Sequence, residues 1–152
     1  MHVQANGLRI AVDDQGPRTA PVVLLIMGLG MQFIAWPQLL VQGLLDRGFR
    51  VVRFDNRDIG LSQGFDHAGV PSLALAGLRY ALRLPVHSPY GLADMAQDTL
   101  GVLDALDVAR AHVCGASMGG MIAQHLAARA PQRVASLTLM MTSSGARSLP
   151  KP

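Results

Sequence analysis

Apolar and polar positions along the chain form short runs that are typical of strands. Residues 22–27, VVLLIM, are apolar throughout, as in a strand that is buried on both faces of a parallel sheet. Residues 8–12 alternate apolar and polar side chains before the polar segment 13–17, which predicts an edge strand followed by a turn. Further short apolar runs predict strands at 50–54, 112–114 and 134–141.

Longer segments between these runs show the spacing of amphipathic helices. One helix is predicted before Gly48 from apolar residues at helical spacing, which are Trp36, Leu39, Leu40, Leu44 and Leu45. Further helices are predicted at 73–82, 91–106 and 118–130, the second with Leu92, Met95, Leu103 and Leu106 on one side. Because strands alternate with helices, we expect an α/β fold in one domain over residues 1–152. It would be a mostly parallel sheet of about six strands, with three main helices lying on both faces.

Composition narrows the class of protein. Hydrophobic residues make up 50% of the chain and charged residues 15%, which excludes a disordered polypeptide. The net charge of +3 comes from scattered arginines, whereas nucleic-acid surfaces concentrate basic residues in one patch. The apolar stretch 22–31 is too short to span a bilayer, and the first residues lack the pattern of a signal peptide. We therefore expect a cytoplasmic protein with neither a nucleic-acid nor a membrane partner.

The segment Gly115-Ala116-Ser117-Met118-Gly119 matches the pattern G-x-S-x-G at a predicted junction between a strand and a helix. A sharp turn there forces the serine into a strained backbone conformation, and the glycines remove side chains that would collide. The serine hydroxyl would stand exposed at the carboxyl end of the sheet. Ser117 is therefore the predicted catalytic nucleophile, and the alternative is a glycine-rich turn with an incidental serine.

A serine nucleophile needs backbone N–H groups directed at the negative charge that develops on the substrate oxygen. The residue after the nucleophile, Met118, would supply one N–H group, and the loop after the third strand would supply the other. That loop is Met27-Gly28-Leu29-Gly30, and Leu29 is the candidate donor. The alternative is a tight turn that only joins a strand to a helix.

Three segments resemble the α/β-hydrolase superfamily: VVLLIMGLG, RFDNRDIGLS and HVCGASMGGMIAQHLAARAPQRVASLTLM. The chain looks most like the branch that contains proline iminopeptidases and the methylesterases of anthracycline biosynthesis. The resemblance implies a serine hydrolase that acts on a carboxylic ester or related acyl compound through an acyl-enzyme. Met27-Gly28 replaces the His-Gly of many relatives, as in similar chains of the methylesterase-like branch. A serine at the turn argues against haloalkane dehalogenases and epoxide hydrolases, which use aspartate.

The resemblance also implies the chain order serine, then Asp or Glu, then histidine. No acid follows Asp107, and no histidine follows His125. His112 opens a predicted strand and His125 lies two turns along the next helix, so we expect neither to reach the serine hydroxyl. The expected fold is therefore an α/β-hydrolase whose carboxyl-terminal part, carrying the acid and the histidine, is missing.

The polar segment Asp55-Asn56-Arg57-Asp58 follows a predicted strand and is a candidate metal site. No histidine or cysteine lies near it in sequence, so we expect a loop-organising motif in which Arg57 and Asp58 pair locally. We expect no metal and no cofactor in this chain.

A different hypothesis is that this chain is a catalytically inactive fragment or one half of a two-chain assembly. Residues 134–141 would form an exposed apolar edge strand, and such edges invite pairing with further chain. We therefore expect two partners. One is a small-molecule ester or acyl substrate, and the other is a carboxyl-terminal chain or segment that covers this edge.

Overall fold

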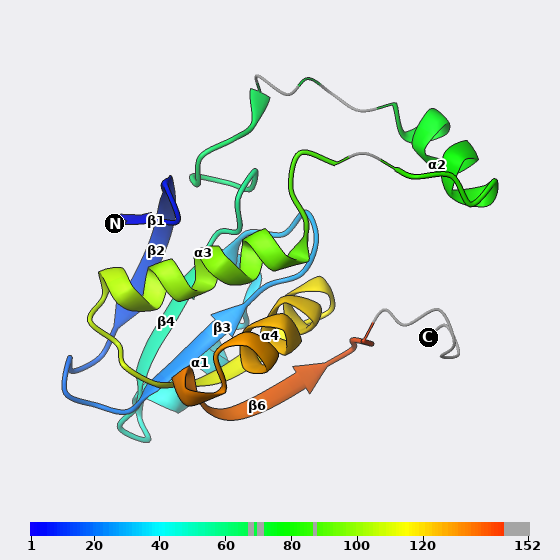
Figure 1. Ribbon diagram of the computed structural model, residues 1–152. Coiled ribbons are helices and arrows are strands. Elements are labelled where there is room, and N and C mark those ends of the chain that lie inside the picture. Colours follow the sequence, from blue (N-terminus) through cyan, green and yellow to red (C-terminus); the bar gives the residue numbers. More distant parts are fainter. Residues whose placement is uncertain (67–68, 70–71, 87, 145–152) are drawn as a thin grey trace.

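The computed structural model describes residues 1–66, 69, 72–86 and 88–144. In this part of the chain a single sheet has the strand order β1-β2-β4-β3-β5-β6. Its strands are β1 (His2–Ala5), β2 (Leu8–Gln15), β3 (Val22–Ile26), β4 (Arg50–Phe54), β5 (Ala111–Ala116) and β6 (Val134–Met140). The β1–β2 and β2–β4 pairs are antiparallel, whereas β3–β4, β3–β5 and β5–β6 are parallel. The prediction of a mostly parallel sheet is confirmed (Figure 1).

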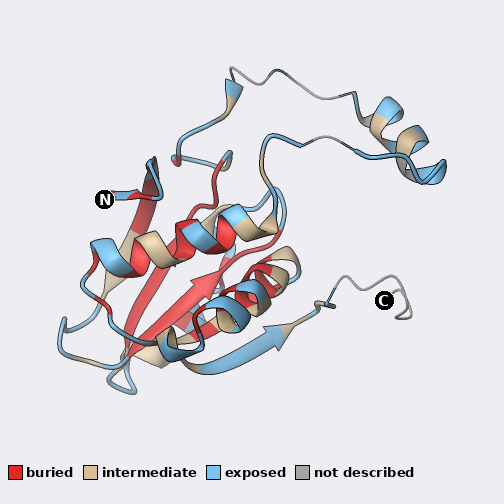
Figure 2. Ribbon diagram, in the orientation of Figure 1, coloured by how far each residue is buried: buried red, intermediate tan, exposed pale blue. Residues whose placement is uncertain are grey.

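Helices cover both faces of this sheet, as predicted. The helices of the described chain are α1 (Gln38–Leu45), α2 (Leu73–Ala81), α3 (Leu92–Ala105) and α4 (Met118–Arg129), with 3-10 turns at Phe33–Ala35 and Pro131–Arg133. Helices α3 and α4 pack on one face with side chains such as Leu24 and Ile26. Helix α1 packs on the other face with Val23 and Leu25. Figure 2 shows that burial is greatest in the central strands between these two layers.

The first predicted strand is an interior strand, not an edge strand. Residues His2–Ala5 form β1 and pair with it, with Val3 opposite Ile10. The strand also runs through the predicted turn as far as Gln15. Asp13 and Asp14 are accommodated in it because Arg53 and Arg50 of neighbouring β4 bind their carboxylates, at 2.7 and 2.8 Å. The hydrogen bond to Asp14 raises the pKa of Arg50. The ion pairs with β4 therefore allow β2 to continue to Gln15, whereas the local sequence predicted a turn after residue 12.

The apolar face predicted for α1 is only partly correct. Trp36 and Val41 are buried, whereas the side chain of Leu39 is 90% exposed and that of Leu40 38% exposed. Pro37 is the N-cap, so the helix begins at Gln38, after Trp36. A helix turns by about 100° per residue, so Leu39 points nearly opposite to Val41. Leu44 and Leu45 are partly buried and pack on the same side as Val41, so the predicted apolar face is wrong only at Leu39 and Leu40.

Two regions expose apolar side chains that the packed layers do not cover. The edge strand β6 exposes Leu137 and Leu139, at 37% and 42% of their surface, as expected for residues 134–141. Helix α2 confirms the predicted short helix and lies away from the sheet (Figure 1). Its side chains Leu75 and Leu78 are exposed. No helix in the described residues combines the length and apolar character required to cross a membrane.

Candidate active site

Ser117 occupies the sharp turn between β5 and α4. Its backbone has φ 52° and ψ −120°, a left-handed conformation that non-glycine residues rarely adopt and that costs about 1–3 kcal/mol. Two hydrogen bonds hold it there: the Ser117 N–H donates to the Met140 carbonyl at 2.9 Å, and the Gly120 N–H donates to the Ser117 carbonyl at 2.9 Å. The residue is exposed at the carboxyl end of β5. The strand–turn–helix geometry predicted for residues 115–119 is therefore present.

Close backbone contacts explain the glycines around this turn. A Cβ atom on Gly115 would overlap the Gly119 carbonyl, and one on Gly119 would overlap the Ile26 carbonyl. The end of β3 therefore packs directly on the first turn of α4. A larger side chain at Gly119 would push α4 away from the end of β3, and one at Gly115 would push β5 and α4 apart.

The loop that follows β3 lies beside the serine. A Cβ atom on Gly28 would lie 3.2 Å from the Ser117 Cβ and 3.6 Å from the Ser117 Oγ. Leu29 comes next with its side chain 76% exposed, and Met118 is the first residue of α4. The three predicted site residues, Ser117, Leu29 and Met118, are thus brought to the same end of the sheet. The roles of Leu29 and Met118 as N–H donors remain predictions.

Two buried polar residues at the end of β4, which the sequence analysis did not single out for this site, bind the same loop. Asn56 donates its side-chain N–H to the Met27 carbonyl at 3.0 Å. Asp55 accepts the Phe33 N–H at 2.7 Å through its Oδ1. The sequence signal was present, because Asp55 and Asn56 follow an apolar strand, but their partner loop lies more than twenty residues earlier in the chain.

No histidine in the described residues is positioned to act on Ser117. His112 lies at the start of β5, roughly 16 Å along the strand, and its Nδ1 hydrogen-bonds with the Ser136 Oγ at 2.8 Å. His125 is exposed on α4, about 12 Å along the helix. The Ser117 hydroxyl hydrogen-bonds to none of the described side chains. His67 and His87 lie outside the described residues.

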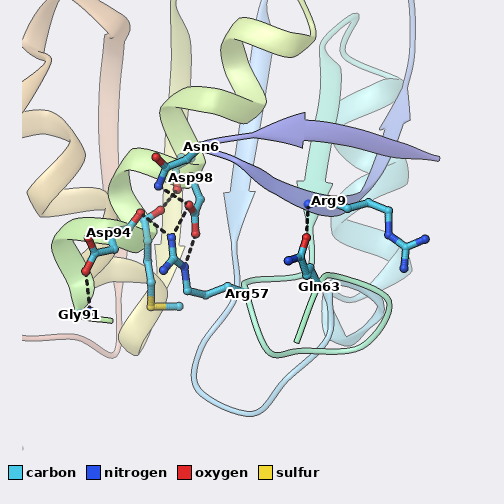
Figure 3. A network of polar contacts seen from close by, with 9 residues as sticks. Asn6, Arg9, Arg57, Gln63, Gly91, Asp94 and Asp98 are labelled. Atoms are coloured by element: carbon cyan, nitrogen blue, oxygen red, sulfur yellow. Dashed lines mark hydrogen bonds and ion pairs between the residues drawn. The ribbon is translucent and has the colours of Figure 1, made fainter. Parts of the chain in front are cut away.

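The prediction that Arg57 and Asp58 pair with each other is wrong. Arg57 forms a two-pronged ion pair with Asp98 of α3, with both contacts at 2.6 Å, and Figure 3 shows the two side chains facing one another. Asn6 donates to the same carboxylate at 2.8 Å. The reason is that α3 presents Asp98 on its buried side, where the Arg57 guanidinium needs a counter-ion. Among the described residues no cluster of three metal-ligating side chains occurs.

Arg57 also contacts two aromatic residues, Phe65 and Tyr90, that precede and follow α2 in the chain. Its Cζ atom lies 5.3 Å from the ring centroid of Phe65 and 5.0 Å from that of Tyr90. Asp58 accepts the Phe65 N–H and the Tyr90 hydroxyl, both at 2.6 Å. Burial would lower the pKa of Arg57, but the Asp98 carboxylate raises it. Burial and the hydrogen bond to Asp58 raise the pKa of Tyr90 to about 12. We call Arg57, Asp58, Phe65, Tyr90 and Asp98 the Arg57 clasp.

Comparisons with known proteins agree with this geometry. Residues 21–151 match the family model described as alpha/beta hydrolase fold. The chain is 39% identical over 125 residues to Rhodomycin D methylesterase DauP of Streptomyces sp. strain C5, covering 82% of this chain and 36% of that protein. It is 36% identical over 126 residues to the Putative carbamate hydrolase RutD of Variovorax paradoxus, covering 82% and 39%.

A solved structure shows the same fold. A hydrolase from Pseudomonas aeruginosa PA01 superimposes with a TM-score of 0.73 at 33% sequence identity, over 94% of this chain and 46% of that one. The chain thus spans less than half the length of these relatives. From its sheet order, its strand–serine–helix turn and these similarities, the chain belongs to the α/β-hydrolase family.

Proposed function

We propose that the complete protein is a serine hydrolase that acts on a carboxylic ester or related acyl compound. The observation that carries the proposal is Ser117, exposed and held at φ 52° between β5 and α4, directly beside Gly28. A hydroxyl in that position is accessible to a substrate carbonyl at the carboxyl end of the sheet. The relatives named a methylesterase and a carbamate hydrolase support a carbonyl substrate with a heteroatom leaving group.

The chemistry would proceed in two stages. The Ser117 Oγ forms a bond to the carbonyl carbon while a base takes the proton of the serine hydroxyl. The carbonyl oxygen becomes an oxyanion, which accepts hydrogen bonds from the backbone N–H groups of Leu29 and Met118. Collapse of this intermediate breaks the bond to the leaving alcohol, which receives the proton, and leaves an acyl-enzyme. A water molecule then adds to the acyl carbon, and the serine and the carboxylic acid are released.

We further propose that the base and its carboxylate partner belong to a carboxyl-terminal segment outside residues 1–152, because no histidine follows His125 and no acid follows Asp107. In this fold the histidine and the acid follow the serine in sequence. The exposed edge of β6 supports the proposal, because a further strand that paired there would cover Leu137 and Leu139. The same segment would bring the missing groups toward the carboxyl end of the sheet.

The test is the Ser117→Ala variant of the complete protein, with Ser136→Ala as its control. Ser117→Ala should lower turnover of an activated ester such as 4-nitrophenyl acetate by several orders of magnitude, because no nucleophile remains. It should leave the fold intact, since alanine removes only a hydroxyl. Ser136→Ala, which removes the partner of His112 on the same sheet, should keep full activity.

Two measurements make the assignment specific. Mass spectrometry after reaction with a fluorophosphonate should find the adduct on the peptide that contains Ser117. Ester hydrolysis at the wild-type rate in Ser117→Ala, or loss of activity in Ser136→Ala instead, would overturn the proposal.

A further inference from the structure

The loop that lies beside Ser117, residues 27–33, is fixed near both ends by the two residues that follow β4. We call it the oxyanion loop. Strands β3 and β4 are parallel neighbours with Ile26 opposite Phe54, so the chain leaves both strands at the same level of the sheet. The first two residues after β4, Asp55 and Asn56, therefore lie next to the first residues after β3. Both are almost fully buried, with 1% and 2% of their surface exposed.

Asn56 holds the start of the oxyanion loop. Its side-chain amide donates to the Met27 carbonyl at 3.0 Å in a buried setting. Met27 immediately precedes Gly28, the residue that packs against the Ser117 Cβ. The bond fixes the orientation of a peptide group only two residues before the Leu29 N–H. A buried carbonyl that lost this donor would have to turn toward another partner, because an unpaired buried acceptor costs about 1–3 kcal/mol.

Asp55 holds the end of the same loop. Its Oδ1 accepts the Phe33 N–H at 2.7 Å, and its Oδ2 accepts the Leu61 N–H at 3.1 Å. Gly60 makes room for this carboxylate, since a Cβ atom there would overlap both the Asp55 Oδ2 and the Gln32 side chain. The buried carboxylate thus bridges the oxyanion loop to the loop after β4. Hydrogen bonds to a charged acceptor are about twice as strong as neutral ones.

We infer that Asp55 and Asn56 are positioning residues that aim the oxyanion loop at the reacting carbonyl. The inference rests on the proposed function, in which the Leu29 N–H stabilises the oxyanion. An oxyanion hole works only when its donors already lie about 2.7–3.1 Å from where the charge develops. Leu29 lies at an exposed turn, with its own side chain largely in solvent, so its packing cannot fix the loop. The hydrogen bonds on either side of it, from the buried side chains of Asp55 and Asn56, supply that constraint.

The test uses the complete protein with two variants that act on opposite ends of the loop, Asn56→Leu and Asp55→Asn. Each variant should lower kcat for 4-nitrophenyl acetate by roughly 10-fold to 100-fold, because small displacements of a catalytic group cost this much. The KM should change by less than about twofold, since ground-state binding makes little use of the oxyanion donors. A loss that appears in kcat and not in KM separates positioning from a general loss of the binding site.

The inhibition constant of a trifluoromethyl ketone provides a second measurement, which would not change if Asp55 and Asn56 had only a structural role. The Ser117 Oγ adds to this carbonyl reversibly, and the product carries an oxyanion in the same hole as the reaction intermediate. The inhibition constant should rise in each variant by about the same factor as kcat falls. Ser62→Ala is the matched control, because the Ser62 hydroxyl donates to the backbone carbonyl of Asp55 at 2.6 Å and accepts the Ala11 N–H at 2.9 Å, so its hydrogen bonds lie outside the oxyanion loop. This control should lower the melting temperature while leaving kcat and the inhibition constant unchanged.

The outcomes separate this inference from the proposed function. If Ser117→Ala retains activity, the proposed function is wrong and the inference falls with it. If Ser117→Ala abolishes activity while Asn56→Leu and Asp55→Asn keep wild-type kcat and inhibition constants, only the positioning role is overturned. Equal losses in Ser62→Ala would also overturn it, because general loosening of the loop after β4 would then explain the effect. If one of the two variants does not fold, the other still tests the inference, because Asn56→Leu and Asp55→Asn act on opposite ends of the oxyanion loop.

Discussion

Strands β3 and β6 flank the same strand, yet one is buried and the other is exposed. Both pair in parallel with β5, where Leu24 and Leu137 lie on either side of Val113. Every residue of β3 is buried, whereas residues 136–139 of β6 are exposed. Strand β3 has β4 on its far side and helices on both faces, while β6 is the last strand of the sheet. Leu24 and Leu137 thus reach opposite degrees of burial because the neighbours of their strands differ.

The same contrast divides the candidate site. On the β3 side, the oxyanion loop is held by Asp55 and Asn56 and packed against Ser117. On the β6 side, the Ser117 N–H hydrogen-bonds to the carbonyl of Met140, and Met141 follows with 86% of its surface exposed. The half of the proposed site that would stabilise charge therefore lies within the described chain. The half that would move a proton is the part that we assign to further chain.

The largest expected effect follows from separating these halves. Purified residues 1–152 should react with a fluorophosphonate roughly a thousandfold more slowly than the complete protein, because we assign the base of Ser117 to a further segment. The isolated chain should also bind a hydrophobic dye or self-associate through residues 137–141. Adding the carboxyl-terminal segment should restore labelling at Ser117 and suppress dye binding together.

Brisk, stoichiometric labelling of a monodisperse chain of residues 1–152 would contradict this expectation. One of the chain's own histidines would then serve as the base. Alanine substitutions of His125 and His112 would identify which one, and the contrast between a complete and an incomplete half of the site would disappear.

The next effect concerns the β3 side alone. Leu29→Pro removes one backbone N–H while keeping the serine, and should cost roughly 2.7–4 kcal/mol of transition-state stabilisation in the complete enzyme, with some local strain. Leu29→Ala keeps the N–H and should retain most of the activity, which makes it the control. The measurement is kcat/KM for an activated ester. An unchanged rate in a folded Leu29→Pro protein would show that Leu29 is not a donor.

A smaller effect tests the burial contrast directly. Leu24→Ala in β3 should lower the free energy of unfolding by about 3 kcal/mol, because the side chain has no exposed surface and leaves a cavity. Leu139→Ala in β6 should cost less than about 1 kcal/mol in residues 1–152, since that leucine is 42% exposed. Urea denaturation measures both. In the complete protein the two losses of unfolding free energy should become more alike if further chain covers β6. Equal losses for Leu24→Ala and Leu139→Ala in residues 1–152 would contradict the difference in burial between β3 and β6.

The smallest effect is spectroscopic and concerns the Arg57 clasp. Tyr90 should ionise near pH 12, whereas an unperturbed tyrosine ionises near 10. Because its pKa is raised in the folded state, neutral Tyr90 stabilises the fold fully below pH 10, and this contribution is lost as the pH rises through 12. An alkaline titration of tyrosinate absorbance, compared with Tyr90→Phe, measures the difference. A Tyr90 that titrates normally would show that its hydroxyl is neither buried nor held by Asp58.

The sequence predicted what local patterns encode. The continuous apolar run at 22–27 identified β3, and the glycines around Ser117 identified the strand-to-helix turn because they meet a steric demand within a few residues. It did not predict that β1 would pair with the outer edge of β2. Nor did it predict that Arg57 would pair with Asp98, 41 residues away, and not with its neighbour Asp58. The Asp55 and Asn56 contacts to residues 27–33 were missed for the same reason. A polar side chain directly after a buried strand indicates that a hydrogen-bonding partner is required. Which residue is that partner depends on the fold, because it can lie far away in the sequence.

The Arg57 clasp has a consequence for how this molecule can be altered. The rings of Phe65 and Tyr90 lie 5.1 Å apart, so the chain departs and returns at nearly one point. The entropy of closing such a loop grows only with the logarithm of its length, and helix α2 lies away from the sheet. We therefore expect that the sequence between Phe65 and Tyr90 can be exchanged for foreign sequence while the sheet and Ser117 keep their places, which the melting temperature and ester turnover of such a variant would test. Directed evolution of the proposed hydrolase would best begin by grafting new segments between these two aromatic residues.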